Sequence, residues 1–327
     1  MEKETRRPWR RWVVLALLII GFVLGGVYKP VQPEILVAPE KLMEEPLFEN
    51  FLGTGPLYLV NTLPTLAITI VLIVLVAFFT NRSLKQSERT DLVPRGIGNL
   101  MEAFFELLYN LTEGSAGTKY VRMIFPWFAT IMFYVLFANL LKLIPGFESI
   151  GVLHHAHGEG HAKELLFGNW YLFTAEEGEY ILAPFLRGIS VDLNFTFALA
   201  LISVVMIQVV GFRAQGIGYL SKFFNTRRMF KVPFFGAMDF LVGLLELISE
   251  LSKILSFAFR LFGNMFAGIV LVAIVAGLLG KFSILPAMVM LFELFVGVIQ
   301  AFVFGMLTMV FMAQATQGHG EEHAEAH

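Results

Sequence analysis

The chain has 327 residues, of which 57% are hydrophobic and 15% are charged. Soluble domains carry about 25% charged residues, so this composition excludes an ordinary soluble globule and predicts a protein that lies in a lipid bilayer. The net charge of -2 excludes a general nucleic-acid binder, and the absence of cysteine excludes disulfides, thiol nucleophiles, Cys-ligated zinc and iron–sulfur clusters.

Six long apolar stretches follow one another along the chain, and each is long enough to be a candidate membrane span. They cover residues 12–28, 56–80, 122–144, 188–211, 236–280 and 282–316. The segments between them are alternately rich in Lys/Arg and in Glu, and Lys and Arg gather on the cytoplasmic side of membrane proteins. Segments 81–95 and 212–235 are therefore predicted to be cytoplasmic, together with both termini, and segments 29–54 and 145–186 to face outward.

The first stretch, 12–28, follows a basic head at residues 1–11, which leaves two interpretations. One is a cleaved signal peptide, and the other is a retained first helix. The flanking sequence GGVYKP has no clear cleavage site between small residues, so a retained helix is favoured.

Residues 96–112 have a different pattern, because the helix they would form is apolar on one face and polar on the other. The apolar face comprises Leu100, Phe104, Leu107, Leu108 and Leu111, and the polar face comprises Asn99, Glu102, Glu106 and Asn110. The flanking loops are basic. This pattern predicts an amphipathic helix that lies on the cytoplasmic membrane surface.

The last two stretches are longer than a bilayer requires. As helices, 236–280 and 282–316 would be about 65 Å and about 50 Å long, against a hydrocarbon core of about 30 Å. Ordinary tilts of about 20° absorb little of this excess, so we predict a steeply tilted helical hairpin that turns near Gly280–Lys281. The predicted fold class is an all-α polytopic membrane protein, with one membrane domain at 12–316 and a polar tail at 317–327.

Polar side chains form a stripe along 236–280, spaced by three or four residues so that they share one helix face. The stripe comprises Glu246, Ser249, Lys253, Ser256, Arg260 and Asn264, with Glu250 beside it. Glu246, Glu250 and Lys253 have an alternative role, which is to form ion pairs with one another near the cytoplasmic boundary. Arg260 lies deeper among phenylalanines, with no acid within one turn, and arginine stays protonated in proteins. Such a cation needs a partner on another helix or subunit, which predicts a functional role for Arg260.

The last stretch contains a single acid, Glu293, and Gln300 follows on the same helix face. A carboxyl group inside a Leu/Phe/Val run that can gain and lose a proton is what a proton path requires. Gln300 has an alternative role as an interhelical hydrogen-bonding residue. Asp192, at the outward start of 188–211, is either a helix N-cap or a further member of such a path.

The histidines all lie outside the apolar stretches. They are His154, His155, His157 and His161 in the outer segment and His319, His323 and His327 in the tail. Clustered histidine can bind transition metals, but the composition of a solvated loop explains these positions as well and is favoured. The sequence predicts neither a metal site nor a cofactor.

The run SKILSFAFRLFGNMFAG at 252–268, followed by IQAFVFGMLTMVF at 299–311, resembles subunit a of F-type ATP synthases. Shorter matches, VDLNFTFALAL, GIGYLSKFF and LELISELSK, extend the resemblance over roughly residues 122–316. The resemblance implies the stator subunit of a rotary ATP synthase. Such a subunit conducts protons through two offset half-channels to and from the carboxylates of a rotating c-subunit ring.

Matched residue by residue, the resemblance makes Arg260 the essential arginine that faces the ring. It implies that Asn264 and Gln300 lie near the outer half-channel and the arginine, and that Glu246, Ser249 and Ser256 belong to the inner half-channel. The residue pattern adds Asp192, Glu250 and Lys253 as further candidates for proton translocation. Family members commonly carry a carboxylate and a histidine on the last two helices. This chain has Ile269 at the first of these positions and Glu293 at the second, so the outer path is expected to depend on Glu293.

The resemblance implies a non-catalytic subunit, without a cofactor, in a bacterial inner membrane. The implied partners are the c-subunit ring, the peripheral-stalk b subunits, the soluble ATPase sector and the lipid bilayer, with no nucleic acid. Two rival functions are a secondary transporter with Arg260 as an anion site and a structural membrane anchor. The first usually shows inverted repeats, which are not visible here, and the second needs neither Arg260 nor the stripe. The coupling ion, H⁺ or Na⁺, stays open because the ring holds the ion site.

Overall fold

The computed structural model describes most of the chain between residues 55 and 317 and parts of the segment before it. The described ranges are 38–43, 45–49, 55–89, 96–144, 147–168, 170–223, 233–279 and 284–317, with Gly53 and single residues between 12 and 23. Residues 1–11, most of the predicted first segment 12–28, the predicted turn at Gly280–Lys281 and residues 318–327 lie outside these ranges.

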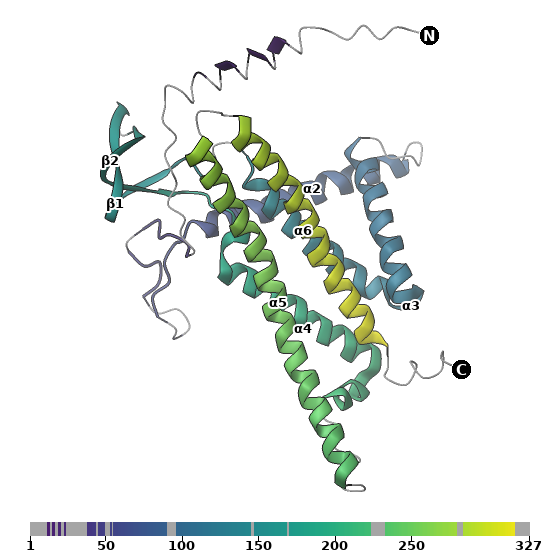
Figure 1. Ribbon diagram of the computed structural model, residues 1–327. Helices are drawn as coiled ribbons and strands as arrows, with labels where there is room; N and C mark the ends of the chain where they lie inside the picture. Colours follow the sequence, from purple (N-terminus) through teal and green to yellow (C-terminus); the bar gives the residue numbers. More distant parts are fainter. Residues whose placement is uncertain are drawn as a thin grey trace. The chain divides into compact units, whose positions relative to one another are not determined.

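Five long apolar helices confirm a mostly helical, polytopic membrane protein (Figure 1). They are α2 (Thr62–Arg89), α3 (Ile97–Leu141), α4 (Leu193–Gln215), α5 (Pro233–Leu279) and α6 (Ile284–Thr316). Two short 3-10 helices flank α4, namely η1 (Ile189–Val191) and η2 (Gly216–Lys222). The five helices correspond to five of the six predicted stretches, although α2 continues to Arg89 in the predicted basic loop 81–95. The stretch at 12–28 stays a prediction.

Helix α3 is a kinked helix of 45 residues that contains both the predicted amphipathic helix and the next predicted span. The kink lies at Gly117, whose φ of 73° and ψ of 164° are not helical and suit glycine, which has no Cβ. The two halves pack against each other, because the rings of Tyr109 and Phe125 lie 5.3 Å apart. Leu108 is buried on this face, whereas Leu107 is exposed. The position of the first half on the membrane surface stays a prediction.

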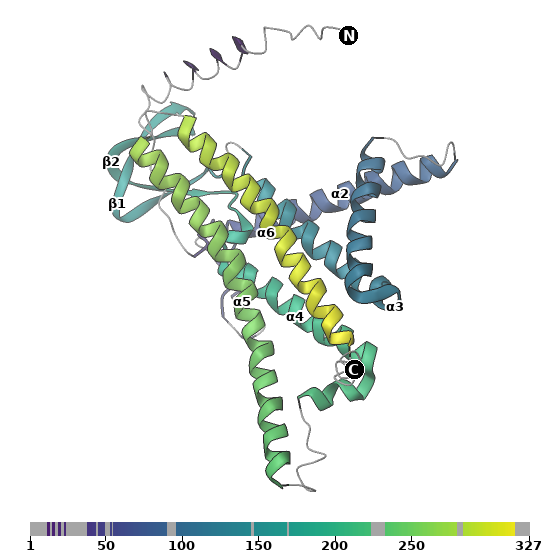
Figure 2. The same cartoon turned by 45° about the vertical axis from the view of Figure 1, so that its right-hand side comes forward.

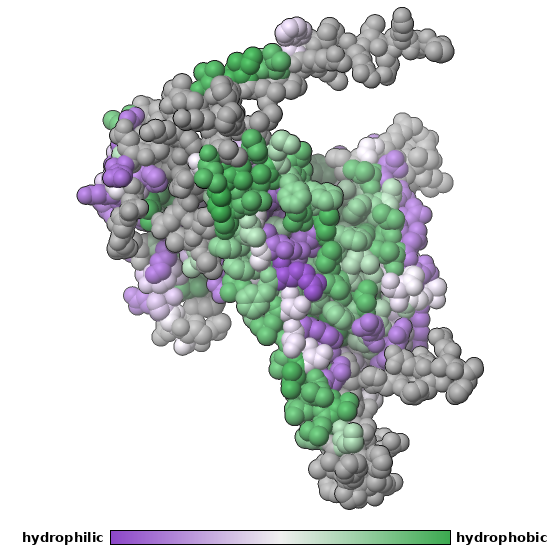
Figure 3. Space-filling model, in the orientation of Figure 1, coloured by the Kyte–Doolittle hydropathy of each residue, from purple (hydrophilic) through white to green (hydrophobic). Residues whose placement is uncertain are grey.

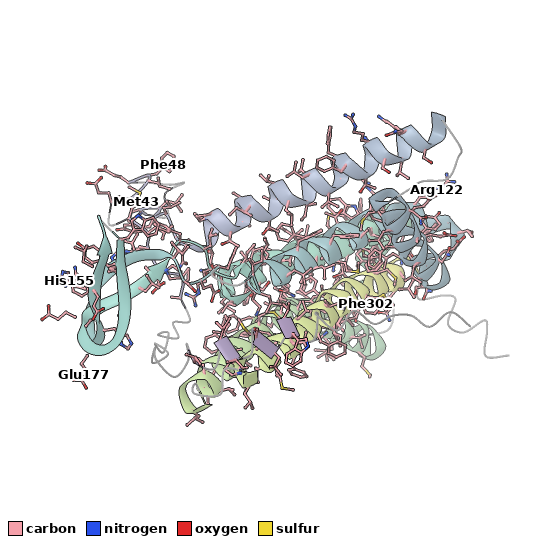
Figure 4. All side chains as sticks on the ribbon, turned by 90° about the horizontal axis from the view of Figure 1, so that it is seen from above. Met43, Phe48, Arg122, His155, Glu177 and Phe302 are labelled. Carbon is pink, nitrogen blue, oxygen red and sulfur yellow. The ribbon has the colours of Figure 1, made fainter. Side chains whose placement is uncertain are left out.

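The segment predicted to face outward contains a β-hairpin, which the hydropathy pattern did not predict. Strand β1 (Gly151–Phe167) pairs in antiparallel fashion with β2 (Trp170–Pro184), and Gly168 has a positive φ of 56° between them. Figure 4 shows His155 and Glu177 on this hairpin. The ring of His155 lies 4.8 Å from that of Tyr180, so this histidine packs on an aromatic neighbour. Among the described residues, no group of three or more His, Asp or Glu side chains is placed to hold a metal ion.

The chain divides into two compact units. Unit 1 comprises Met1–Pro64, Lys142–Arg187 and Met265–Val296, and unit 2 comprises Thr65–Leu141, Gly188–Asn264 and Gly297–His327. Helices α5 and α6 both pass through the two units, and each unit contains part of the predicted polar machinery.

Within unit 2, α5 and α6 lie side by side and run in opposite directions (Figures 1 and 2). The rings of Phe257 and Phe304 are 5.1 Å apart, and both side chains are fully buried. Gly305 of α6 lies close to α3, since a Cβ at this position would be 2.8 Å from the Cβ of Met132. The contact between Phe257 and Phe304 identifies the face of α5 that packs against α6.

The free surface of α5 is largely apolar. Its exposed large side chains include Leu245, Leu251, Leu255 and Phe259. Figure 3 shows the apolar surface of this helix interrupted by hydrophilic residues. An apolar surface of this extent is typical of contact with lipid or with another membrane subunit.

Candidate functional site

Arg260 carries its charge on α5 without an acidic partner in the described part of the chain. Its Nη2 atom donates to the Oγ atom of Ser256, one turn earlier, at 3.2 Å. Ion pairs among the described residues join Lys142 with Glu293 and Lys253 with Glu250, and they do not include Arg260. Arg260 itself is half-buried, between exposed Phe259 and fully buried Leu261. A guanidinium with five N–H groups therefore keeps most of its donor capacity for groups outside the chain.

Asn264 and Gln300 join α5 to α6 by a side-chain hydrogen bond. The Nδ2 atom of Asn264 donates to the Oε1 atom of Gln300 at 2.6 Å. This bond is the interhelical contact considered for Gln300 from sequence. The Nε2 atom of Gln300 is buried and has no hydrogen-bond partner among the described residues. Buried amide donors are rarely left unsatisfied, so this position has donor capacity for a water molecule or another polar group.

Glu250 and Lys253 form an ion pair, which is the alternative role that the sequence offered for them. The Nζ atom of Lys253 lies 2.8 Å from the Oε1 atom of Glu250. Glu250 is 5% exposed and accepts a second hydrogen bond from the Nε2 atom of Gln208 in α4, at 2.9 Å. The hydroxyl of Tyr219 in η2 donates in turn to the Oε1 atom of Gln208 at 2.8 Å. A buried carboxylate is tolerated when it is paired and hydrogen-bonded in this way.

The sequence reasoning missed Gln208 and Tyr219 as members of this network. The signal for Gln208 was present, because it is a polar side chain in the middle of an apolar stretch. The remaining stripe residues differ in exposure. Ser249 and Ser256 are exposed, and Glu246 is half-buried.

Glu293 belongs to unit 1 and is paired with Lys142, the residue that follows α3. The Lys142 Nζ atom lies 2.5 Å from the Glu293 Oε1 atom, and the two side chains are 3% and 7% exposed. Lys142 was not a candidate from sequence, because a lysine at the end of an apolar stretch commonly reaches toward the interface. The sequence pattern did not predict that Lys142 is buried beside Glu293.

Asp192 caps helix α4. Its Oδ1 atom accepts a hydrogen bond from the backbone N–H of Asn194 at 2.9 Å, which confirms the N-cap interpretation. Next to this cap, the Oγ atom of Ser190 donates to Asn139 at 2.6 Å, and Asn139 donates to the carbonyl of Gly297 at 3.0 Å. Asn139 and Ser190 are fully buried polar residues that sequence reasoning also missed.

Comparison with known proteins decides the family. The family model for the ATP synthase A chain matches residues 64–313. The ATP synthase subunit a of Mycobacterium bovis is 27% identical over 265 residues, which cover 80% of this chain and 89% of that protein. The corresponding subunit of Campylobacter jejuni is 31% identical over 251 residues, covering 75% and 87%. That of Desulforamulus reducens is 31% identical over 235 residues, covering 68% and 70%.

The chain belongs to the ATP synthase A chain family. The resemblance found in the RLFGNMFAG region is therefore confirmed, and it extends further toward the amino terminus than the sequence motifs indicated. Membership associates this integral membrane protein with ATP synthesis and proton transport. All residues proposed from sequence for proton translocation lie within the matched range, as do Lys142 and Gln208.

Proposed function

We propose that this A chain family member is the stator subunit that passes protons to and from the carboxylates of a c-subunit ring. The observation that carries the proposal is Arg260, a permanent cation on an apolar helix with a serine as its hydrogen-bond partner and no ion pair among the described residues. A carboxylate on a neighbouring subunit supplies the missing negative charge. The cation favours the ionised form of each ring carboxylate, and so drives proton release before that carboxylate passes.

Two offset half-channels lead to this position in the proposal. Glu246, Ser249 and Ser256 line the inner path, and the exposure of both serines is consistent with a face that meets water or protein. Asn264 and Gln300 lie beside the arginine. Glu250 and Lys253 neutralise each other, so their part is to support the path. Glu293 is the principal carboxyl group of the outer path. Asp192, which also caps α4, is a further member of that path.

The geometry of α5 and α6 suits contact with a cylinder of helices. At about 1.5 Å per residue, α5 and α6 are about 70 Å and about 50 Å long, against a hydrocarbon core of about 30 Å. A steeply tilted hairpin fits both helices into a bilayer, and their antiparallel packing in unit 2 supports it. The exposed apolar side chains of α5 then lie against the ring or lipid.

The remaining parts of the proposal concern the assembly. The chain works with the c-ring, the peripheral-stalk b subunits and the soluble ATPase sector in a bacterial inner membrane, with both termini on the cytoplasmic side. It has no catalytic site of its own, because ATP is made in the soluble sector. Its membrane domain extends over 12–316, with the tail at 317–327.

The test is the variant Arg260→Ala in the assembled complex, with Arg122→Ala as a matched control because Arg122 is an exposed arginine on α3 (Figure 4). In inverted membrane vesicles, Arg260→Ala is expected to abolish ATP-driven proton pumping, while ATP hydrolysis by the soluble sector persists. Arg122→Ala is expected to pump normally. Normal pumping by Arg260→Ala would refute the stator assignment. A purified chain that carries anions without a ring would instead favour a secondary transporter.

A further inference from the structure

Lys142 and Glu293 form an ion pair in unit 1 that is sealed from solvent within the chain. The ammonium and carboxylate are 2.5 Å apart, and their side chains are 3% and 7% exposed. Moving two charges out of water carries a large desolvation penalty, and removing one partner leaves the other charge buried and uncompensated. Each of the two residues therefore compensates the buried charge of the other.

Gly268 of α5 provides the space in which the Glu293 carboxyl lies. A Cβ at Gly268 would be 2.6 Å from Oε1, 3.0 Å from Cδ and 3.1 Å from Cγ of Glu293. Carbon atoms do not approach an oxygen atom to 2.6 Å without a clash, so any other residue at 268 pushes the carboxyl away from its present position. The end of a glutamate side chain is flexible, so it can give way without disrupting the helices. The consequence is a displaced carboxyl group and a lengthened ion pair.

We infer that Lys142 and Gly268 are positioning residues for Glu293: the lysine holds the carboxylate in place through the ion pair, and the glycine lets it lie against α5. The inference rests on the proposed role of Glu293 as a proton carrier. A proton that binds Glu293 neutralises the carboxylate and weakens its bond to the ammonium, because hydrogen bonds between charged partners are the stronger ones. When the proton moves on, the ion pair re-forms. Lys142 thus returns the carboxylate to one fixed position after each proton has left.

The first experiment measures ATP-driven proton pumping in inverted vesicles, divided by the amount of chain found in the purified complex. Lys142→Met is expected to lower this rate roughly tenfold or more, because it leaves the carboxylate without its cation. Lys142→Arg keeps a cation and is expected to restore most of the rate. Lys119→Met, which removes an exposed lysine of α3, is the control for loss of a positive charge.

Gly268→Ala tests position without changing charge. It is expected to lower the pumping rate while the chain still assembles, since the group that moves is the flexible end of Glu293. Gly114→Ala is the matched control, because a Cβ at Gly114 would meet nothing within 4 Å. Wild-type pumping by Lys142→Met or by Gly268→Ala, or a failure of Lys142→Arg to rescue, would overturn the inference.

The double variant Lys142→Met/Glu293→Gln separates this inference from the proposed function. It leaves no buried charge, so assembly is expected to recover relative to Glu293→Gln alone, while pumping stays low because glutamine carries no proton. Wild-type pumping by the double variant would refute the proton-carrying role of Glu293, and with it the positioning role.

A cross-linking experiment tests the contact between residues 142 and 293 independently of transport. The chain has no cysteine, so Lys142→Cys/Glu293→Cys can be joined in the assembled complex by a short bifunctional thiol reagent. Efficient cross-linking supports the contact whatever the transport result is, so a transport failure would then fall on the proposed function. Absence of the cross-link would refute the contact itself.

Discussion

Replacing Gln208 is expected to show how strongly the buried carboxylate of Glu250 depends on helix α4. Gln208 donates to Glu250 at 2.9 Å and accepts from the Tyr219 hydroxyl at 2.8 Å, so Gln208→Leu removes both hydrogen bonds. Glu250 is 5% exposed and cannot turn to water within the chain. Lys253, at 2.8 Å, stays in place as a donor.

The expected magnitude follows from the charge on the acceptor. Hydrogen bonds to charged groups contribute about 1.5–3 kcal/mol, whereas interhelical side-chain hydrogen bonds in a membrane protein average about 0.6 kcal/mol. The acceptor here is a buried carboxylate, so a coupling of about 1.5 kcal/mol between Gln208 and Glu250 is expected. Loss of the Tyr219 bond adds about 1 kcal/mol to the effect of Gln208→Leu alone.

A double-mutant cycle measures the coupling. The purified chain in mixed detergent micelles is titrated with dodecyl sulfate, and unfolding is followed by circular dichroism for Gln208→Leu, Glu250→Leu and the double variant. Gln314→Leu is the control, because Gln314 is an exposed glutamine on α6. A coupling energy below about 0.5 kcal/mol would show that the Gln208–Glu250 contact contributes little to compensating the carboxylate.

Two further predictions concern packing and accessibility. Gly305→Ala is expected to destabilise the chain by about 1–3 kcal/mol in the same titration, because the added methyl meets Met132 at 2.8 Å; unchanged stability would mean that α3 and α6 are less closely packed than the structure shows. In the assembled complex, Ser256→Cys is expected to react with a small charged thiol reagent added from the cytoplasmic side, whereas Phe257→Cys is not, because Ser256 is exposed and Phe257 is 2% exposed. An unreactive Ser256→Cys would indicate dry helix packing instead of an aqueous path.

The long helices were predictable from the sequence because lipid imposes a simple requirement on it. A span must be apolar for about 20 residues, and this signal is local and strong. The stripe on α5 was predictable for a similar reason, since a regular helix fixes which residues share a face. The sequence did not predict that the amphipathic helix and the next span join into one kinked helix, α3. A single glycine, Gly117, determines where its two halves fold back on each other.

The spacing of polar and apolar residues along the chain does not predict which distant residues pair with each other. Lys142 and Glu293 are separated by 151 residues, and Gln208 and Glu250 by 42. Which helices become neighbours depends on packing of the whole chain, and no local pattern contains that information. The β-hairpin was missed for a different reason. Its strands contain glycines and charged residues, so they lack the apolar–polar alternation from which strands are predicted.

Ionisable side chains in the apolar helices are compensated in two different ways, and the difference bears on function. Glu250 with Lys253, and Glu293 with Lys142, are neutralised within the chain. Arg260 forms no ion pair with any described residue, and its hydrogen-bond partner is a neutral serine. Since a lone cation in lipid is strongly disfavoured, we expect its compensation to come from another subunit. A moving ring that presents one carboxylate after another meets this requirement at every step, whereas a fixed internal partner would leave the arginine nothing to act on.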